Sequence, residues 1–173
     1  MTSSFGGISL NRTASGRWSF FAGRPMEVQR DFKELLELFN EREIECIIVG
    51  AYALAFHGAP RFTGDIDIYA RPTPENAARI LDALAAFGFG SLGLKAEDFQ
   101  RPGQVVQLGV PPVRIDLVTS LTGVTWEEAS AGKVPGKYGD VDVYYLGRDQ
   151  FIQNKRAIGR RKDLADLEAL GET

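Results

Sequence analysis

The stretch from Thr63 to Ile68, which reads Thr-Gly-Asp-Ile-Asp-Ile, constrains the fold of this chain more than any other. The alternation of polar and apolar residues predicts a β-strand with one buried and one exposed face. Asp65 and Asp67 then stand side by side on the exposed face, about 6–7 Å apart at Cα. Because neighbouring carboxylates repel each other, the pair indicates a bound cation, and Mg²⁺, which prefers oxygen ligands, suits it best.

Composition and charge restrict the class of protein. At 173 residues, with 44% hydrophobic and 25% charged residues, the chain is long enough for one domain with its own core. A net charge of −3 disfavours a general nucleic-acid binder, and one cysteine with one histidine disfavours a zinc finger or a Cys-His catalytic pair. Since no apolar run approaches the ~20 residues of a membrane span and no signal peptide is evident, we expect a cytoplasmic protein.

Periodicity predicts an α/β (α+β) fold in which a mixed β-sheet of about four to five strands carries helices mainly on one face. Residues 1–24, rich in Ser, Gly, Arg and Thr, are expected to form a loosely ordered N-terminal arm, and residues 25–173 a single domain. The expected helices cover residues 28–40, 51–57, 74–87, 126–131, 149–159 and 164–170. The expected strands cover residues 44–49, 65–70, 104–110, 113–118 and 141–146, with the third and fourth joined as a hairpin.

A glycine directly after the first expected strand is a candidate phosphate site. Gly50 separates the apolar run ending at Val49 from the expected helix, and a helix that starts at a glycine offers free N–H groups and its positive dipole end to an anion. The simpler alternative is a glycine needed only for a tight turn. The acid pair on the next strand favours the phosphate interpretation, because the two features together describe a nucleoside triphosphate site.

Three segments in order, Val49-Gly50-Ala51, Asp65-Ile66-Asp67-Ile68 and Arg114-Ile115-Asp116-Leu117, resemble the nucleotidyltransferase superfamily of DNA polymerase beta type, in its minimal single-domain branch. The strings at residues 57–65 and 154–163 are similar to those of bacterial members and abortive-infection type toxins. The resemblance covers roughly residues 44–170 and implies a nucleotidyltransferase-like fold.

The resemblance also implies roles for particular residues. Asp65 and Asp67 would bind two Mg²⁺ ions, with Mn²⁺ as the alternative metal, and Asp116 would complete the metal site and help to activate an acceptor hydroxyl. The helix that begins at Gly50 would hold the triphosphate. The family usually has Gly-Ser or Gly-Gly at this junction, whereas this chain has Ala51, which leaves only backbone donors for the phosphates.

A triphosphate facing three carboxylates needs nearby cationic side chains as well as divalent ions. Basic residues crowd into positions 155–162, and Arg61 lies just before the acid pair. The alternative for this cluster is a solvated basic helix end. The predicted nucleotide-binding residues, of which Lys155 is the strongest basic candidate, are Gly50, Ala51, Arg61, Thr63, Lys155 and Arg160.

A second Asp-x-Asp, at Asp140 and Asp142, lacks the preceding glycine and helix start. We interpret Asp140 as a turn residue after Gly139 and Asp142 as an outward-facing strand residue.

The sequence leads to the hypothesis of a Mg²⁺-dependent nucleotidyltransferase that moves a nucleoside monophosphate from an NTP such as ATP to an acceptor hydroxyl and releases pyrophosphate. One alternative is a catalytically degenerate binding or regulatory protein of the same fold, for instance in a toxin–antitoxin pair with a cognate antitoxin. Another is two-metal phosphoester hydrolysis, which the same acids could perform. Acceptors compatible with the sequence are a protein side chain, an RNA end and a small molecule such as an antibiotic.

Overall fold

A computed structural model describes residues 3–5, 8–12, 18–22, 28–110 and 112–172. The main helices are α1 (Arg30–Glu41), α2 (Gly50–Phe56), α3 (Pro74–Leu84), α4 (Glu97–Gln100), α5 (Trp126–Gly132), α6 (Arg148–Ile158) and α7 (Arg161–Ala169). The strands that follow α1 are β4 (Cys46–Val49), β5 (Asp65–Ala70), β6 (Val105–Val110), β7 (Val113–Val118), β8 (Val134–Tyr138) and β9 (Val141–Tyr145). None of the helices in these described ranges is long and apolar enough to cross a bilayer.

Within the first 24 residues, β1 (Ser3–Phe5), β2 (Ile8–Arg12) and β3 (Trp18–Ala22) form a small antiparallel sheet. The rest of this segment lies outside the described residues. The loosely ordered arm and its boundary at residue 24 therefore stay predictions.

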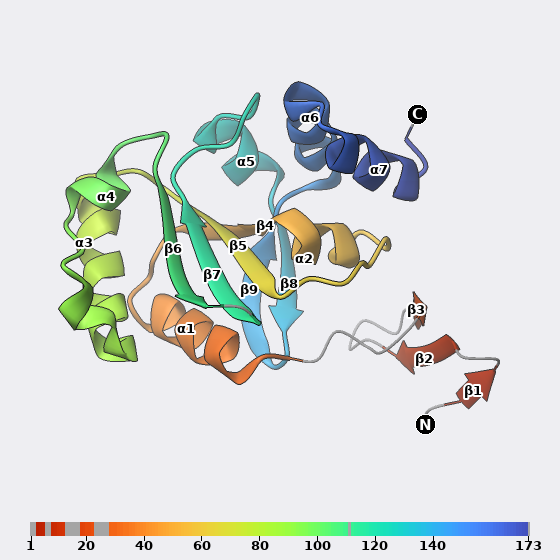
Figure 1. The fold of residues 1–173 in the computed structure, drawn as a ribbon, viewed down its shortest axis with the longest axis horizontal. Coiled ribbons are helices and arrows are strands. Elements are labelled where there is room, and N and C mark those ends of the chain that lie inside the picture. The colour runs from red at the N-terminus through yellow and green to blue at the C-terminus, as the bar shows by residue number, and fades with distance from the viewer. Residues whose placement is uncertain (1–2, 6–7, 13–17, 23–27, 111, 173) are drawn as a thin grey trace.

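The main sheet has six strands in the order β6-β7-β5-β4-β9-β8 (Figure 1). Strands β5 and β7 are parallel, as are β4 and β9, and the other neighbouring pairs are antiparallel. The α/β fold class and the β6–β7 hairpin are confirmed, but β8 makes the sheet one strand larger than expected. Its sequence, Val-Pro-Gly-Lys-Tyr, contains two residues that normally disfavour strands, and it is tolerated because β8 is an edge strand.

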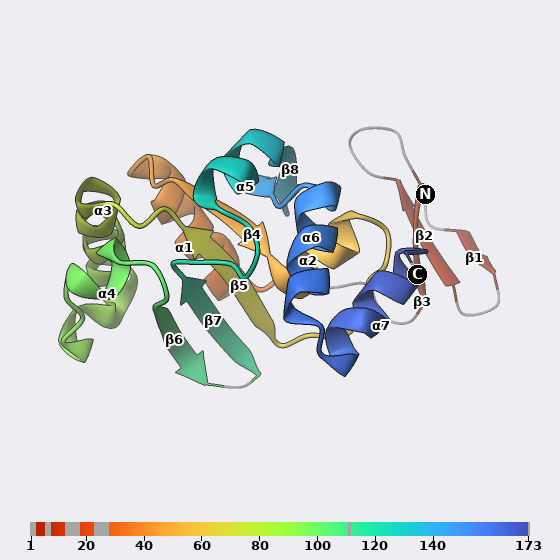
Figure 2. The same ribbon diagram turned by 90° about the horizontal axis from the view of Figure 1, so that it is seen from above.

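Alternation along β5 and β7 decides which face of the sheet is buried. Ile66, Ile68, Ile115 and Leu117 are almost fully buried and share one core with apolar residues of α1 and α3. The residues between them therefore face the opposite side of the sheet, as the alternation predicts. Two views place α3 and α4 at one end of the main domain and α6 and α7 toward the other (Figures 1 and 2).

The start of α3 is held by two side chains. Thr73 is the N-cap and accepts a hydrogen bond from the backbone N–H of Asn76 at 3.2 Å, and Pro74 occupies the first helical turn. The buried amide of Asn76 accepts from the Glu45 N–H and donates to the carbonyls of Glu45 and Arg71, at 2.9–3.0 Å. Asn76 thus connects the helix start to the ends of β4 and β5.

We expect Asn76→Ala to lower the free energy of unfolding by about 2–3 kcal/mol, because it leaves buried backbone groups without partners. Asn40→Ala is the matched control, since Asn40 is exposed and its amide makes one hydrogen bond, to the Asp142 carbonyl. The control should cost about 1 kcal/mol or less. Urea denaturation measures both, and equal losses would show that Asn76 does not have this connecting role.

Candidate active site

Parallel pairing of β5 with β7 brings the three predicted acids together. The register places Asp67 opposite Asp116 and Asp65 opposite Arg114. In a parallel pair, residues opposite each other point to the same face, so all three carboxylates stand on the face of the sheet turned away from the α1–α3 core. The carboxyl group of Asp116 is therefore on the same face of the sheet as the other two acids.

Arg114 lies between two of these acids. One guanidinium nitrogen, Nη2, donates to Asp65 Oδ2 at 2.8 Å and to Asp116 Oδ2 at 3.1 Å. Its Nε is 3.0 Å from Asp116 Oδ1, which is an ion-pair distance, but the two atoms are not aligned as a hydrogen bond and both are buried without another partner among the described residues. This role of Arg114 was not predicted from the sequence.

The start of α2 lies directly against the acid cluster. Gly50 has a φ of +64°, a conformation that disfavours every other residue except asparagine and aspartate, and a Cβ at this position would overlap Oδ2 of Asp67. Glycine is thus required at this junction both for the backbone turn and for the close approach of the Asp67 carboxylate. Ala51, the next residue, is buried.

The environment of Asp67 disfavours its charged form. Burial is the largest cause, and the carboxylates of Asp116 and Asp65 add to it, so the pKa of Asp67 rises from 3.8 to about 6. The positive charges of Lys155 and Lys162 act in the opposite direction and lower the pKa of this carboxylate. Lys162 is exposed and was not among the predicted site residues, although it belongs to the basic cluster.

The donor set of the cluster fits a divalent cation. Carboxylate oxygens are the ligands that Mg²⁺ prefers, and Asp116 Oδ1 is a buried acceptor that makes no hydrogen bond within the described residues. Across residues 28–110 and 112–172, however, no three acidic, histidine or cysteine side chains are gathered tightly enough to hold an ion as they stand. The acids are adjacent but are arranged around Arg114.

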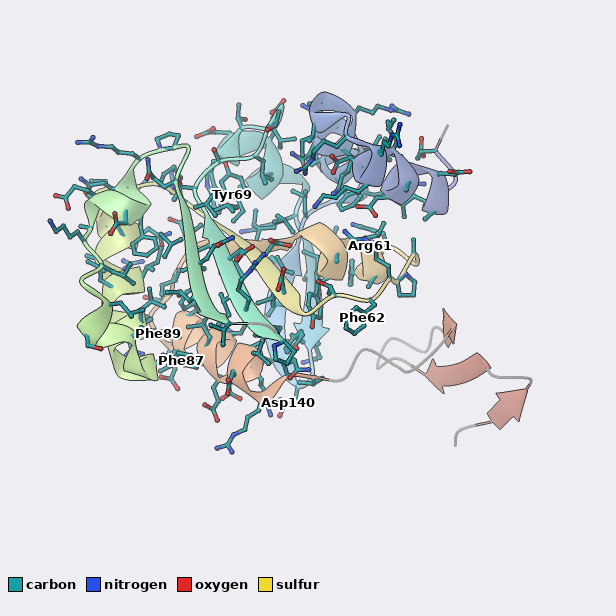
Figure 3. The ribbon with its side chains drawn as sticks, viewed as in Figure 1. Arg61, Phe62, Tyr69, Phe87, Phe89 and Asp140 are labelled. Atoms are coloured by element: carbon teal, nitrogen blue, oxygen red, sulfur yellow. The ribbon has the colours of Figure 1, made fainter. Side chains whose placement is uncertain are left out.

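All three cations that were predicted to bind the nucleotide form ion pairs within the chain. Lys155, only 6% exposed, contacts Asp163 and Asp166 at 3.0 Å each. Arg61 binds Asp166 through two nitrogens, at 2.8 and 3.3 Å, and Arg160 binds Asp163 at 2.8 Å. This cluster ties α6 and α7 to the α2–β5 loop, where Figure 3 shows Arg61 on the side of α7.

The two aspartates of this buried cluster were missed by the sequence analysis. Burial raises the pKa of Asp163, but hydrogen bonds from Arg160 and Lys155 outweigh burial and bring the pKa down to about 2. A usable signal was present, since residues three apart on a helix share a face and Asp163 and Asp166 directly follow the basic run.

The remaining candidates have local roles. The Thr63 hydroxyl accepts from the Asp65 N–H and donates to its carbonyl, both at 3.1 Å, which shapes the start of β5. Asp140 and Asp142, of the second Asp-x-Asp, are exposed and pair with Lys33 and Lys137. Asp140 lies at the β8–β9 turn beside α1, as expected for a turn residue (Figure 3).

No protein-family model and no curated protein sequence matches the chain. Among solved structures, a Thermotoga maritima protein provisionally assigned as a nucleotidyltransferase superposes with a TM-score of 0.55 at 16% identity, covering 80% of this chain and 89% of that protein. The antibiotic-resistance factor ANT(2'')-Ia superposes with a TM-score of 0.50 at 14% identity, covering 81% and 80% respectively. The nucleotidyltransferase-like fold is confirmed by these likenesses.

The raised pKa of Asp67 makes stability depend on pH. Between pH 4 and 6 the folded chain retains a proton that the unfolded chain releases, so the free energy of unfolding should fall as pH rises through this interval. At pH 8 in chelator, Asp67→Asn should be more stable than the wild type by about 1–3 kcal/mol. Urea denaturation at pH 4 and pH 8 measures this. Asp142→Asn, at an exposed carboxylate, should leave the pH dependence unchanged, and the same pH dependence in Asp67→Asn would contradict the assignment.

The buried cluster predicts that Lys155 is needed for stability whatever its role toward a nucleotide. Lys155→Met removes the cation that Asp163 and Asp166 share and leaves them only Arg160 and Arg61, so it should cost about 2–4 kcal/mol in the free energy of unfolding. Lys162→Met, at an exposed position in the same basic run, should change it by less than about 0.5 kcal/mol. Thermal and urea denaturation measure both, and a similar small effect at the two lysines would show that the cluster does not support α7.

Proposed function

We propose that this chain is a Mg²⁺-dependent nucleotidyltransferase that moves a nucleoside monophosphate from an NTP to an acceptor hydroxyl. The observation that carries the proposal is the placement of Asp65, Asp67 and Asp116 on one face of two paired strands, directly against the helix start at Gly50. The acids that would bind the metals therefore lie next to the backbone amides that would bind the phosphates. The nucleotidyltransferase-like fold supports the same reaction class.

Each acid has a distinct role in this proposal. Asp65 and Asp67 would hold two Mg²⁺ ions, or Mn²⁺ in their place, and the bound metal would supply charge stabilisation at the α-phosphate and the leaving group. Asp116 would help to hold a metal, and it accepts or orients the proton of the acceptor hydroxyl. The hydroxyl oxygen forms a bond to the α-phosphorus, the bond between the α-phosphorus and the bridging oxygen breaks, and pyrophosphate leaves.

Backbone and cationic groups would hold the triphosphate. The amides of Gly50 and Ala51 are proposed to bind the β- and γ-phosphates, with Thr63 ordering the adjacent loop. The ion-pair cluster sets three cations, Arg61, Lys155 and Arg160, against two carboxylates, so it keeps a net positive charge beside the site. Lys162 is added to this set because it is exposed and its charge reaches Asp67.

The main rival is a binding or regulatory protein of the same fold, such as a member of a toxin–antitoxin pair. Two observations favour it, the alanine at position 51 and the engagement of Arg114 with two of the three acids. Under this rival, an NTP binds with Mg²⁺ but no nucleotide is transferred. A hydrolase using the same acids would instead release orthophosphate.

The test is incubation with each α-labelled NTP, Mg²⁺ and a cell extract, followed by separation of protein, RNA and small molecules. The wild type should transfer label to one fraction, which identifies the acceptor as a protein side chain, an RNA end or a small molecule such as an antibiotic. Asp65→Asn and Asp67→Asn should each lower the rate by about 100-fold or more, because charge stabilisation at the phosphates is lost. Asp142→Asn, in the exposed Asp-x-Asp, should keep the wild-type rate.

Three results would reject nucleotidyl transfer. An unchanged rate in Asp65→Asn and Asp67→Asn would show that the acids are not catalytic. Tight Mg²⁺-dependent NTP binding with no labelled product in any fraction would support the regulatory protein, and release of orthophosphate rather than pyrophosphate would support the hydrolase.

A further inference from the structure

We infer that Arg114 is a built-in counter-ion of the acid cluster, which must leave Asp65 and Asp116 before these acids bind a divalent cation. Metal binding would then depend on the phosphates of the nucleotide, which offer the displaced guanidinium a new partner. The inference rests on the proposed function and concerns the regulation of that same site.

The geometry of Arg114 places it in competition with a metal. Its Nη2 contacts one oxygen of Asp65 and one of Asp116, at 2.8 and 3.1 Å, so a single nitrogen bridges the two strands. Hard cations bind through carboxylate oxygen, and an ion held between the two carboxylates would take the place in which Nη2 now lies. The guanidinium and a metal therefore compete for these two acids.

The pairing is also incomplete. Arg114 brings one positive charge to a cluster of three carboxylates, and Asp67 forms no hydrogen bond or ion pair with the guanidinium within the described residues. The Nε of Arg114 and Oδ1 of Asp116 are buried and not aligned as a hydrogen bond, which leaves a donor and an acceptor without the full gain of pairing. A divalent cation supplies twice the charge and can replace the guanidinium.

Arg114 also has an available way out of the cluster. Its side chain is 30% exposed although its Nε is buried, so part of the side chain reaches the surface of the site. A planar guanidinium binds phosphate oxygens through two parallel hydrogen bonds, which lysine does not. A triphosphate arriving with its metal can therefore take up the arginine that the metal displaces. By linkage, nucleotide and metal each raise the affinity for the other.

The test is a titration of the nucleotide-free protein with Mn²⁺. Electron paramagnetic resonance measures the concentration of free Mn²⁺ and so gives the affinity. Arg114→Met keeps the aliphatic length of the side chain but removes its charge, and it should bind Mn²⁺ at least about 10-fold more tightly than the wild type. Its melting temperature should also rise more on addition of Mn²⁺ than that of the wild type. Arg114→Lys keeps the charge and should stay within about threefold of the wild type.

Two control variants separate this effect from a general loss of positive charge. Arg71→Met removes a half-exposed arginine that pairs with Glu45 at the far end of β5 and should leave the Mn²⁺ affinity unchanged. Lys162→Met removes a charge that acts on Asp67 without contacting the carboxylates and should change the affinity by less than about threefold. Circular dichroism verifies that every variant is folded.

The outcomes distinguish this inference from the proposed function. If Arg114→Met binds Mn²⁺ no more tightly than the wild type, Arg114 is not a competing counter-ion, even where the wild type transfers label. If Arg114→Met binds more tightly but the wild type transfers no nucleotide, the counter-ion role stands and nucleotidyl transfer falls. If neither the wild type nor Arg114→Met binds Mn²⁺, Arg114 is not what keeps the metal out, and the counter-ion role falls whatever the labelling assay shows.

Discussion

The in-register parallel pairing of β5 with β7 is the constraint on which the rest of the site depends. It stacks Asp67 beside Asp116 and Asp65 beside Arg114, so carboxylates that are far apart in the sequence share one small surface. A shift by one residue would turn these groups into the core and the isoleucines to the solvent. The buried alternation of Ile66, Ile68 and Leu117 therefore holds the acids in place, and core packing enforces a charge arrangement that is unfavourable by itself.

Cationic groups in two places compensate the negative charge of the acids. Arg114 neutralises part of it from within the sheet, while the basic run of α6 and α7 acts from the side. Lys155 and Arg160 of that run, together with Arg61, hold α7 in place, because they are paired with two nearly fully buried aspartates. A buried cation with two carboxylate partners is a poor mobile ligand but a rigid support, which leaves the exposed Lys162 freer to meet a substrate.

Much of this could be predicted from the sequence, because local patterns determine it. Alternation identified β5 and β7 and the outward face of their acids, and the glycine after β4 identified the helix start beside them. Edge strand β8 was missed because its proline and glycine oppose strand formation in isolation. The ion pairs were missed for another reason. Arg114 with Asp65, and Arg61 with Asp166, join residues 49 and 105 positions apart, and only the folded chain brings them together.

The difference between Lys155 and Arg114 shows why residue type alone did not reveal the roles of the basic groups. The dense basic run made Lys155 the strongest basic candidate. Its partners Asp163 and Asp166, however, lie within the next eleven residues and neutralise its charge. Arg114 lies outside any basic run and carries no such signal, but it contacts Asp116 of its own strand, and strand pairing brings Asp65 to it as well. In both cases the nearest carboxylates decide what the cation does. The charge of a side chain predicts the kind of residue with which it pairs, and the topology of the fold determines which residue that is.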